Sequence, residues 1–210
     1  METREQHEAN WHREAVGGLW DEIGKLQFDF LLAQGMKPYH YLLDIGCGSL
    51  RGGVRFIAYL EPGHYFGVDK SNELLDAGRM IELVRYELSE KQSTLVQKDN
   101  FDFSDLGWQF DYALAQSVFT HLPLNSIIRC VRNVEQVLVP AGRFYATFFE
   151  NRLGKFNLSP IMHPRTDGLD GTSFFDADPY HYDFETFQWI CRGTNLIVKY
   201  IGDWGHPRDQ

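Results

Sequence analysis

The sequence lacks the features that mark secreted and membrane-spanning proteins. Its three cysteines, Cys47, Cys130 and Cys191, are too few and too scattered for a disulfide framework or a zinc site. No stretch approaches the roughly 18 apolar residues of a membrane helix. The N-terminal stretch METREQHEANWHREAV lacks the apolar core of a signal peptide. We therefore expect reduced thiols in a cytoplasmic protein with no membrane partner.

The sequence also has no excess of basic residues. It contains 20 lysines and arginines against 29 aspartates and glutamates, which gives a net charge of −9. Because a negative surface does not attract phosphate backbones, this charge disfavours DNA and RNA as partners. No internal repeat or low-complexity linker divides the 210 residues. We expect a flexible N-terminal segment over residues 1–17 and a single domain over residues 18–210, with a homodimer left open.

Apolar periodicity predicts an initial helix followed by alternating strands and helices. The first helix is expected from about Gly18 to Gln34, and later helices start near Arg51, Ser71 and Leu124. The predicted strands are YLLDI, HYFGVD, TLVQ, FDYALAQ and RFYATFF. Strands that alternate with helices indicate a parallel sheet covered by helices on both sides. The fold class is therefore predicted to be a Rossmann-like, doubly wound α/β fold.

The last third of the sequence departs from this alternation. Residues 151–182 are rich in proline, glycine, aspartate and aromatic residues, and predict irregular structure. A helix near Phe184 to Arg192 and a strand, NLIVKYIGDW, are expected after them. That strand is the last one that we expect the chain to form.

The glycine-rich loop in LLDIGCGSLRGG follows the first predicted strand, at the sheet edge where open α/β folds bind ligands. Gly46 and Gly48 allow the backbone to turn tightly and approach a ligand, while Gly52 and Gly53 allow close helix packing. A dinucleotide would fit such a loop. Asp44, however, would repel a pyrophosphate and suits a cationic ligand group such as an ammonium or a sulfonium. S-adenosylmethionine has both groups; the alternative is an aspartate that only caps the turn.

Three later segments place polar residues at the same predicted edge. Asp69 ends the second strand, where a carboxylate can accept hydrogen bonds from both ribose hydroxyls of a nucleoside cofactor. NAD enzymes also have an acid at this position, so Asp69 does not separate NAD from S-adenosylmethionine. In KDNFDF, Asp99 can accept from an adenine amino group and Phe101 can pack on the ring, although a plain turn explains this segment as well. AQSVFTHLP then follows the fourth strand. The candidate cofactor contacts in these segments are Asp69, Asp99, Asn100, Phe101 and Ser117.

Together, LLDIGCGSLRGG, HYFGVDKS, DNFDF, AQSVFTHLP and VLVPAGRFYATFFE resemble the ordered motifs of class I S-adenosylmethionine-dependent methyltransferases. The resemblance spans about residues 18–204 and implies the strand order 3-2-1-4-5-7-6, with strand 7 antiparallel. It also implies that Gly46 and Gly48 surround the methionine moiety, that Asp44 faces its ammonium group and that Asp69 holds the ribose.

The sequence departs from the family pattern at two places. Leu50 stands where the family has its third glycine, and the sequence ends where strand 7 would begin, so we expect strand 7 to be absent through C-terminal truncation. The segment VGGLWDEIGKLQ resembles the N-terminal cover of a methyltransferase subgroup. That resemblance implies that Trp20 or Gln27 closes over the cofactor.

A methyltransferase must align its acceptor with the sulfonium and, for a hydroxyl acceptor, remove a proton. We interpret residues 151–182 as an insertion on the acceptor side. The candidate bases are His181, slightly favoured, then His121, with Glu150 as the alternative and His163 less favoured. FFDADPYHYDF mixes acids and aromatic residues, as sugar-binding surfaces do, although a solvated loop is an equal alternative. Glu150, Asp176 and Asp178 are candidate ligands for Mg²⁺.

The acids and aromatic residues suit a hydroxyl-rich acceptor better than a nucleic acid. A further resemblance is to bacterial sugar O-methyltransferases, including those acting on mycobacterial methylmannose polysaccharides. The sequence thus predicts O-methylation of a sugar, glycan or other small molecule. Two alternatives stay open: an NAD-linked oxidoreductase, disfavoured by Asp44 and by the missing second βαβαβ half, and a catalytically silent cofactor-binding module of the same fold.

Overall fold

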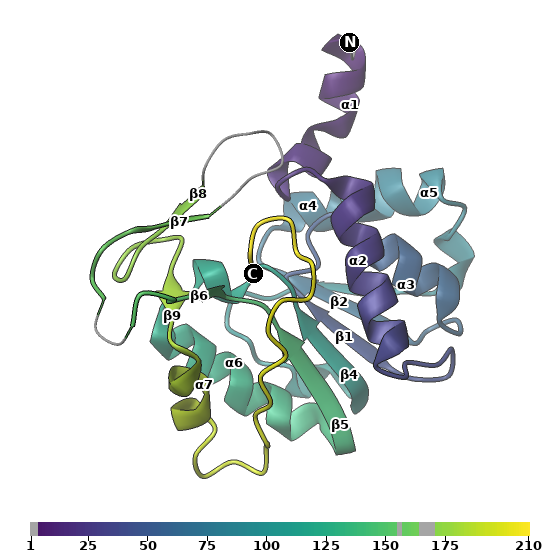
Figure 1. Ribbon diagram of the computed structural model, residues 1–210. Coiled ribbons are helices and arrows are strands. Elements are labelled where there is room, and N and C mark those ends of the chain that lie inside the picture. Colours follow the sequence, from purple (N-terminus) through teal and green to yellow (C-terminus); the bar gives the residue numbers. More distant parts are fainter. Residues whose placement is uncertain (1–3, 155–156, 164–170) are drawn as a thin grey trace. The chain divides into compact units, whose positions relative to one another are not determined.

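The computed structural model describes residues 4–154, 157–163 and 171–210 and divides into two units, Met1–Asp99 and Asn100–Gln210 (Figure 1). Five strands form a parallel sheet of order β3-β2-β1-β4-β5. This order and the intervening helices confirm the predicted Rossmann-like α/β fold. In the described residues the sheet ends at β5, so the last two strands of the expected order are not formed there.

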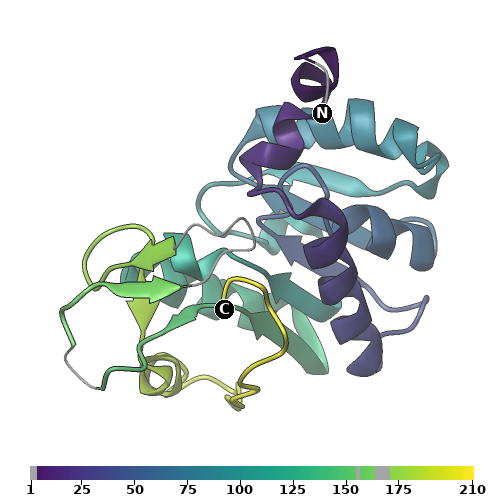
Figure 2. The same ribbon diagram turned by 45° about the horizontal axis from the view of Figure 1, so that its top comes forward.

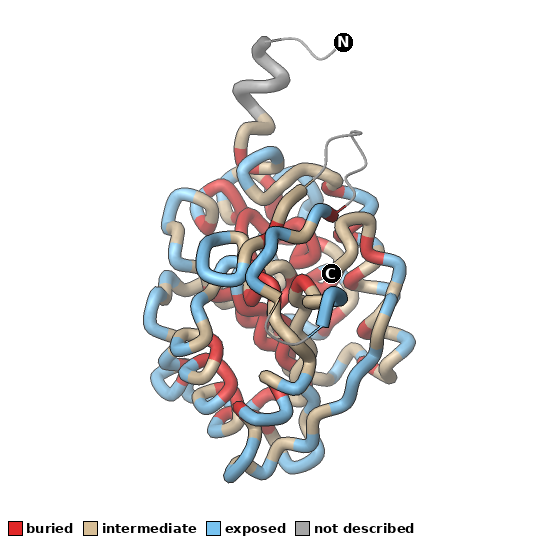
Figure 3. Tube along the Cα trace, turned by 60° about the vertical axis from the view of Figure 1, so that its left-hand side comes forward, coloured by how far each residue is buried: buried red, intermediate tan, exposed pale blue. Residues whose placement is uncertain are grey.

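The first unit supplies three strands of the sheet and five helices. Its helices are α1 (Arg4–Ala15), α2 (Trp20–Ala33), α3 (Gly53–Tyr59), α4 (Asn72–Ala77) and α5 (Leu83–Arg85), and its strands are β1 (Leu42–Ile45), β2 (Tyr65–Asp69) and β3 (Thr94–Gln97). A π-helical turn, Gly78–Glu82, joins α4 to α5. Strands β1 and β2 are buried along almost their whole length, as expected for parallel strands covered on both faces. Figure 3 colours the trace by burial, with the buried residues in red.

Helix α1 lies within residues 1–17, the segment that the sequence predicts to be flexible. The charged sequence has no apolar stripe, yet the chain from Arg4 to Ala15 is helical. Its last turn contains His12, whose side chain is fully buried. The contact that buries His12 is polar, because its ring lies 2.6 Å from the carboxylate of Glu82. Glu82 is 70 residues away in the sequence, so a local hydrophobic pattern could not reveal this contact.

The second unit supplies the other two strands of the sheet. It contains β4 (Phe110–Ala115), α6 (Leu124–Val137), β5 (Leu138–Ala146), β6 (Phe149–Glu150), β7 (Ile161–His163), β8 (Gly171–Ser173), β9 (His181–Tyr182) and α7 (Phe184–Ile190). Helix α6 buries one apolar stripe, namely Ile127, Cys130, Val131, Val134 and Val137, which confirms the helical period seen in the sequence. In place of wholly irregular structure, the insertion contains an antiparallel β7–β8 pair, and β9 runs parallel to β6 (Figure 2).

The predicted strand NLIVKYIGDW is not formed. Residues 195–204 have no regular secondary structure, and Ile197 is 96% exposed while Tyr200 and Ile201 are about half exposed. A β-branched sequence becomes a strand only where a neighbouring strand pairs with its backbone and a layer covers its apolar face. Among the helices in the described part of the chain, none has the length and apolar character needed to cross a membrane.

Candidate functional site

The glycine-rich loop and the end of β2 form one hydrogen-bonded unit, as the sequence predicts. Gly46 and Gly48 both have positive φ, 69° and 55°, which favours glycine at these turns. The backbone N–H of Gly48 donates to Asp69 Oδ2 at 2.9 Å, and that of Ser71 donates to Asp69 Oδ1 at 2.8 Å. Each carboxylate oxygen keeps a second lone pair. Asp69 therefore orders the loop and can still accept hydrogen bonds from a ligand.

Asp44 lies in the interior beside this loop. It is only 4% exposed, and its Oδ2 accepts a hydrogen bond from the Tyr65 hydroxyl at 2.7 Å. Burial raises the pKa of Asp44 to about 7. Gly53 makes room for this pair, because a Cβ there would lie 2.6 Å from the Tyr65 hydroxyl oxygen. A cationic group placed beside Asp44 would favour its ionised form.

The N-terminal segment contacts the glycine-rich loop directly. A Cβ on Gly48 would lie 2.6 Å from Val16 Cγ1, so the two residues touch only because Gly48 has no side chain. Ser49 Oγ donates to the His12 backbone carbonyl at 3.1 Å. These contacts were not predicted from the sequence, in which Val16 belongs to a segment expected to be flexible.

Arg51 adds two further links between the loop and the N-terminal segment. Its Nη1 donates to the carbonyl oxygens of Val16, at 2.8 Å, and Gly18, at 3.1 Å. Gln27, a predicted cofactor contact, packs on the loop as well, because a Cβ on Gly52 would lie 2.5 Å from Gln27 Oε1. The N-terminal cover implied by the family resemblance thus lies against the glycine-rich loop within the first unit.

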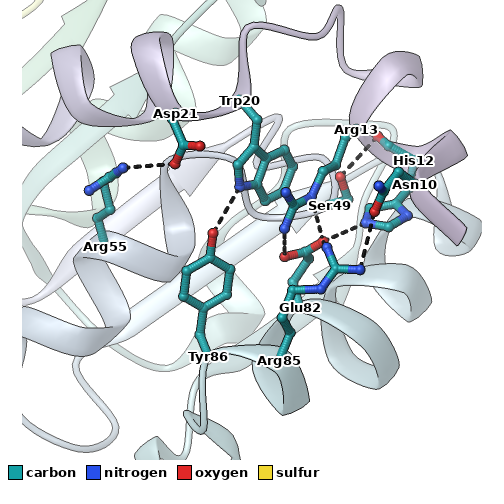
Figure 4. Close-up of polar contacts among 10 residues, drawn as sticks. All are labelled: Asn10, His12, Arg13, Trp20, Asp21, Ser49, Arg55, Glu82, Arg85 and Tyr86. Atoms are coloured by element: carbon teal, nitrogen blue, oxygen red, sulfur yellow. Dashed lines mark hydrogen bonds and ion pairs between the residues drawn. The ribbon is translucent and has the colours of Figure 1, made fainter. Parts of the chain in front are cut away.

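A buried carboxylate, Glu82, binds the end of helix α1, just before the N-terminal cover (Figure 4). Its Oε1 lies 2.6 Å from His12 Nε2, Arg13 donates to both of its oxygens at 2.9 and 2.7 Å, and Arg85 donates at 2.9 Å. Although burial by itself raises the pKa of Glu82, the hydrogen bonds from Arg13 and His12 bring that pKa below its ordinary value. Nothing local in the sequence marks Glu82 for this role.

Trp20 belongs to the same cluster (Figure 4). The Arg13 guanidinium carbon lies 4.3 Å from the centre of its ring, and its Nε1 donates to the Tyr86 hydroxyl at 3.3 Å. With 8% of its surface exposed, Trp20 is a packing residue of the cover in this structure. A contact between Trp20 and a cofactor stays a prediction.

The predicted adenine-side residues lie at a turn after β3. Asp99 and Asn100 are exposed, and Asn100 Oδ1 accepts from the Asp102 backbone N–H at 3.0 Å. Phe101 is partly exposed with a φ of 57°, and its carbonyl accepts from Asn133 Nδ2 at 2.8 Å. The turn that the sequence left as an alternative is therefore present, and it leaves the Asp99 carboxylate at the surface.

His121 and Asp178 form an exposed pair in the second unit. His121 Nδ1 lies 2.6 Å from Asp178 Oδ1, with 57% and 56% of the two side chains exposed. When Nδ1 donates to the carboxylate, Nε2 is the basic nitrogen. Two bonds align the flanking segments: the Tyr180 N–H donates to the Thr120 carbonyl at 2.7 Å, and the Tyr182 hydroxyl donates to the Leu122 carbonyl at 2.6 Å.

His181, ranked above His121 by the sequence, is a buried residue instead. It is 2% exposed, and its Nδ1 lies 3.1 Å from Ser173 Oγ, which in turn lies 2.8 Å from His163 Nε2. Burial lowers the pKa of His163 below its ordinary value. His121, by contrast, has both an accessible ring and a carboxylate partner, and the choice of base between the two histidines stays a prediction.

The predicted magnesium site is not supported by the structure. Within the residues that the structure covers, no group of three or more histidines, cysteines, aspartates or glutamates can hold a metal ion. Asp178 is paired with His121, whereas Glu150 accepts from the Tyr200 hydroxyl at 2.7 Å. Asp176 is exposed. The acids share a segment of sequence, but the fold gives them separate partners.

The second unit has a cavity of about 240 Å³, and several of the residues that line it are near His121 and Asp178 in the sequence. Pro123 and Leu124, which closely follow His121, form part of its wall. Other lining residues are the aromatic Phe175, Tyr180 and Tyr182, the candidate base His181, and the polar Asn151, Asp183 and Thr186. The cavity thus combines aromatic faces with hydrogen-bonding groups.

Comparison with known proteins identifies the domain. Residues 43–144 match the methyltransferase domain family. The CcbJ methyltransferase from Streptomyces caelestis has a similar structure, with a TM-score of 0.65, 16% identity and coverage of 92% of this chain and 91% of that chain. Glycopeptide N-methyltransferase MtfA has a TM-score of 0.64, 16% identity and coverage of 89% and 87%.

A third similar structure is the magnesium protoporphyrin IX methyltransferase ChlM from Synechocystis PCC 6803, solved with bound S-adenosylmethionine. Its TM-score is 0.59 at 15% identity, over 85% of this chain and 72% of that chain. Similarity at this level of identity reflects a common fold. Residues 43–144 thus match a methyltransferase domain model, and the chain has the fold of class I S-adenosylmethionine-dependent methyltransferases.

Proposed function

We propose that the protein uses S-adenosylmethionine to methylate a hydroxyl group of a sugar, a glycan or another small molecule. The cofactor assignment is supported by the domain match and by Asp69, whose carboxylate lies on the glycine-rich loop. Asp44 supplies a carboxyl for the cationic end of the cofactor. Structures of ChlM and MtfA contain S-adenosylmethionine, although their names, a porphyrin and a glycopeptide methyltransferase, refer to different acceptors.

The observation that carries the choice of a hydroxyl acceptor is the His121–Asp178 pair. A hydroxyl is a poor nucleophile while it is protonated, so a base must take its proton as the new O–CH₃ bond forms and the C–S⁺ bond breaks. The products are a methyl ether, S-adenosylhomocysteine and a proton held on His121 Nε2. Asp178, 2.6 Å from Nδ1, orients the ring and stabilises the imidazolium.

The cavity whose wall includes Pro123 and Leu124 suits a compact ring. Its volume of about 240 Å³ lies below the roughly 300–1,000 Å³ of pockets for drug-sized ligands. The aromatic faces of Phe175, Tyr180 and Tyr182 can pack on the apolar face of a sugar, while Asn151 and Asp183 can bind its hydroxyls. A net charge of −9 disfavours a nucleic-acid acceptor. We propose no metal cofactor for the reaction.

The test is a methyl-transfer screen over sugars, phenols and carboxylic acids that measures release of S-adenosylhomocysteine. With an accepted sugar, His121→Ala is expected to lower kcat by about 10²–10⁴ without changing cofactor affinity. His40→Ala is the matched control, because His40 is a half-buried histidine in the first unit. Turnover of sugars by His121→Ala at the wild-type rate would contradict the proposed base. Cofactor binding with no turnover of any acceptor would favour the catalytically silent module.

A further inference from the structure

Among the described residues that line the cavity of the second unit, Asp183 is the only aspartate, glutamate, lysine or arginine. We propose that its carboxylate binds a protonated amino group of the acceptor, so that the acceptor is an amino sugar or another small ring with both an ammonium group and a hydroxyl. This inference rests on the proposed function, because it assumes that the cavity holds the acceptor. It narrows the class of acceptor and gives Asp183 the role of selecting it.

The carboxylate of Asp183 is available to a ligand. Asp183 lies between β9 and α7 and is the N-cap residue of that helix, with the extended backbone that is usual at this position (Figure 1). Its side chain nevertheless makes no capping hydrogen bond, and the Thr186 N–H donates to the Asp183 backbone carbonyl at 3.0 Å instead. Within the part of the chain that the structure describes, no group forms a hydrogen bond or an ion pair with this carboxylate.

The aromatic part of the cavity wall also suits a cation. Phe175, Tyr180 and Tyr182 line the cavity, and the rings of the two tyrosines lie 6.1 Å apart between centroids at an interplanar angle of 24°. The Tyr182 hydroxyl donates to the Leu122 carbonyl at 2.6 Å, which fixes the position of its ring. Because the face of an aromatic ring carries partial negative charge, it attracts an ammonium group. A carboxylate and aromatic faces in one cavity therefore favour a cationic ligand.

The other polar groups of the wall offer no positive charge to an anion. Asn151 and Thr186 are uncharged, so they can bind hydroxyls but cannot balance a second negative charge. His181 is only 2% exposed, and its Nδ1 lies 3.1 Å from Ser173 Oγ. A carboxylic acid or a phosphorylated sugar would thus meet the Asp183 carboxylate without a counter-charge. The cavity disfavours such acceptors.

The charge on the amino group also decides which atom receives the methyl group. An ammonium nitrogen has no lone pair, so it cannot attack the methyl group of the sulfonium while Asp183 holds it protonated. A hydroxyl of the same ring keeps its lone pairs and gives its proton to His121 Nε2 as the O–CH₃ bond forms and the C–S⁺ bond breaks. The products are an O-methyl amino sugar, S-adenosylhomocysteine and a proton on His121.

The experiment compares the binding of glucosamine and glucose to the full chain at pH 7 by ligand-observed NMR titration. Glucosamine is expected to bind about tenfold more tightly, because a hydrogen bond between ionised groups is roughly twice as strong as a neutral one. Asp183→Asn should remove this preference, and asparagine keeps a residue suited to the N-cap of α7. Asp176→Asn is the matched control, because Asp176 is an exposed acid that does not line the cavity. It should keep the preference of the wild type.

Methyl transfer to glucosamine is measured separately, and fragmentation mass spectrometry locates the new methyl group. A methyl group on oxygen is expected, and one on nitrogen would overturn the proposal. Equal affinities of the wild type for the two sugars, no binding of either, or an unchanged preference in Asp183→Asn would overturn it as well. A preference for glucosamine that depends on Asp183, without transfer to any acceptor, would support the cation site and refute the proposed function.

Discussion

Replacing Asp44 with asparagine tests the buried carboxyl beside the glycine-rich loop. Burial raises the pKa of Asp44 from its ordinary 3.8 to about 7 in the folded chain. In the unfolded chain the pKa is about 3.9. Between these two values the folded state keeps a proton that the unfolded state has lost, so the free energy of unfolding falls as the pH rises. Above pH 7 the carboxyl is ionised in both states, and the cost of burying its charge lowers the free energy of unfolding by the full amount.

The size of this penalty follows from the pKa difference. A shift of about three units at about 1.4 kcal/mol each amounts to about 4 kcal/mol, more than half of which appears between pH 5 and pH 8. Asparagine fits the same space beside Tyr65 and has no proton to lose. We therefore expect Asp44→Asn to unfold at a higher urea concentration than the wild type at pH 8, by a margin that shrinks at pH 5.

The same change should weaken the cofactor site. An ammonium or sulfonium beside Asp44 gains from a full negative charge, so Asp44→Asn should bind S-adenosylmethionine at least about tenfold more weakly at pH 8. Urea unfolding at the two pH values and calorimetry at pH 8 measure both effects. If the variant and the wild type have parallel stability–pH profiles, Asp44 does not titrate between pH 4 and pH 7. Unchanged cofactor affinity would separate Asp44 from the cationic end of the ligand.

Three further predictions concern the other groups of the site. Asp69→Ala should weaken S-adenosylmethionine binding by about 2–4 kcal/mol, because two ribose hydroxyl bonds to a charged acceptor are lost; calorimetry on the folded variant checks this. Glu82→Gln should lower the free energy of unfolding by about 2–4 kcal/mol at pH 7, since Arg13 and Arg85 lose a buried counter-charge but remain partly exposed. Because folding lowers the pKa of Glu82, this difference should shrink as the pH falls below the ordinary carboxyl pKa of about 4.3, and disappear once Glu82 is protonated in the folded state. Methyl transfer should continue unchanged in EDTA, and its loss would show that a metal takes part.

The parts of the fold that were predicted correctly depend on local signals. Buried parallel strands appear as short apolar runs, and the turn after β1 needs glycines at Gly46 and Gly48 whatever lies elsewhere in the chain. Asp69 was placed at the glycine-rich loop because the carboxyl ends of neighbouring parallel strands lie at one edge of a sheet. These inferences needed no knowledge of distant partners.

The features that the sequence did not reveal depend on contacts between distant residues. His12 is buried against Glu82, 70 residues away in the sequence, a contact that no helical period reveals. His181 is buried beside Ser173, while His121 has its carboxylate partner 57 residues away. Residues 195–204 have the alternation of a strand but no strand pairs with them.

The central claim is that the methyltransferase domain binds S-adenosylmethionine, and calorimetric titration of the full chain with S-adenosylmethionine and with NAD tests it most directly. The glycine-rich loop, Asp44 and Asp69 predict saturable binding of S-adenosylmethionine at one site and no heat of binding with NAD. Binding of NAD without binding of S-adenosylmethionine would contradict the account and favour an oxidoreductase on the same type of sheet.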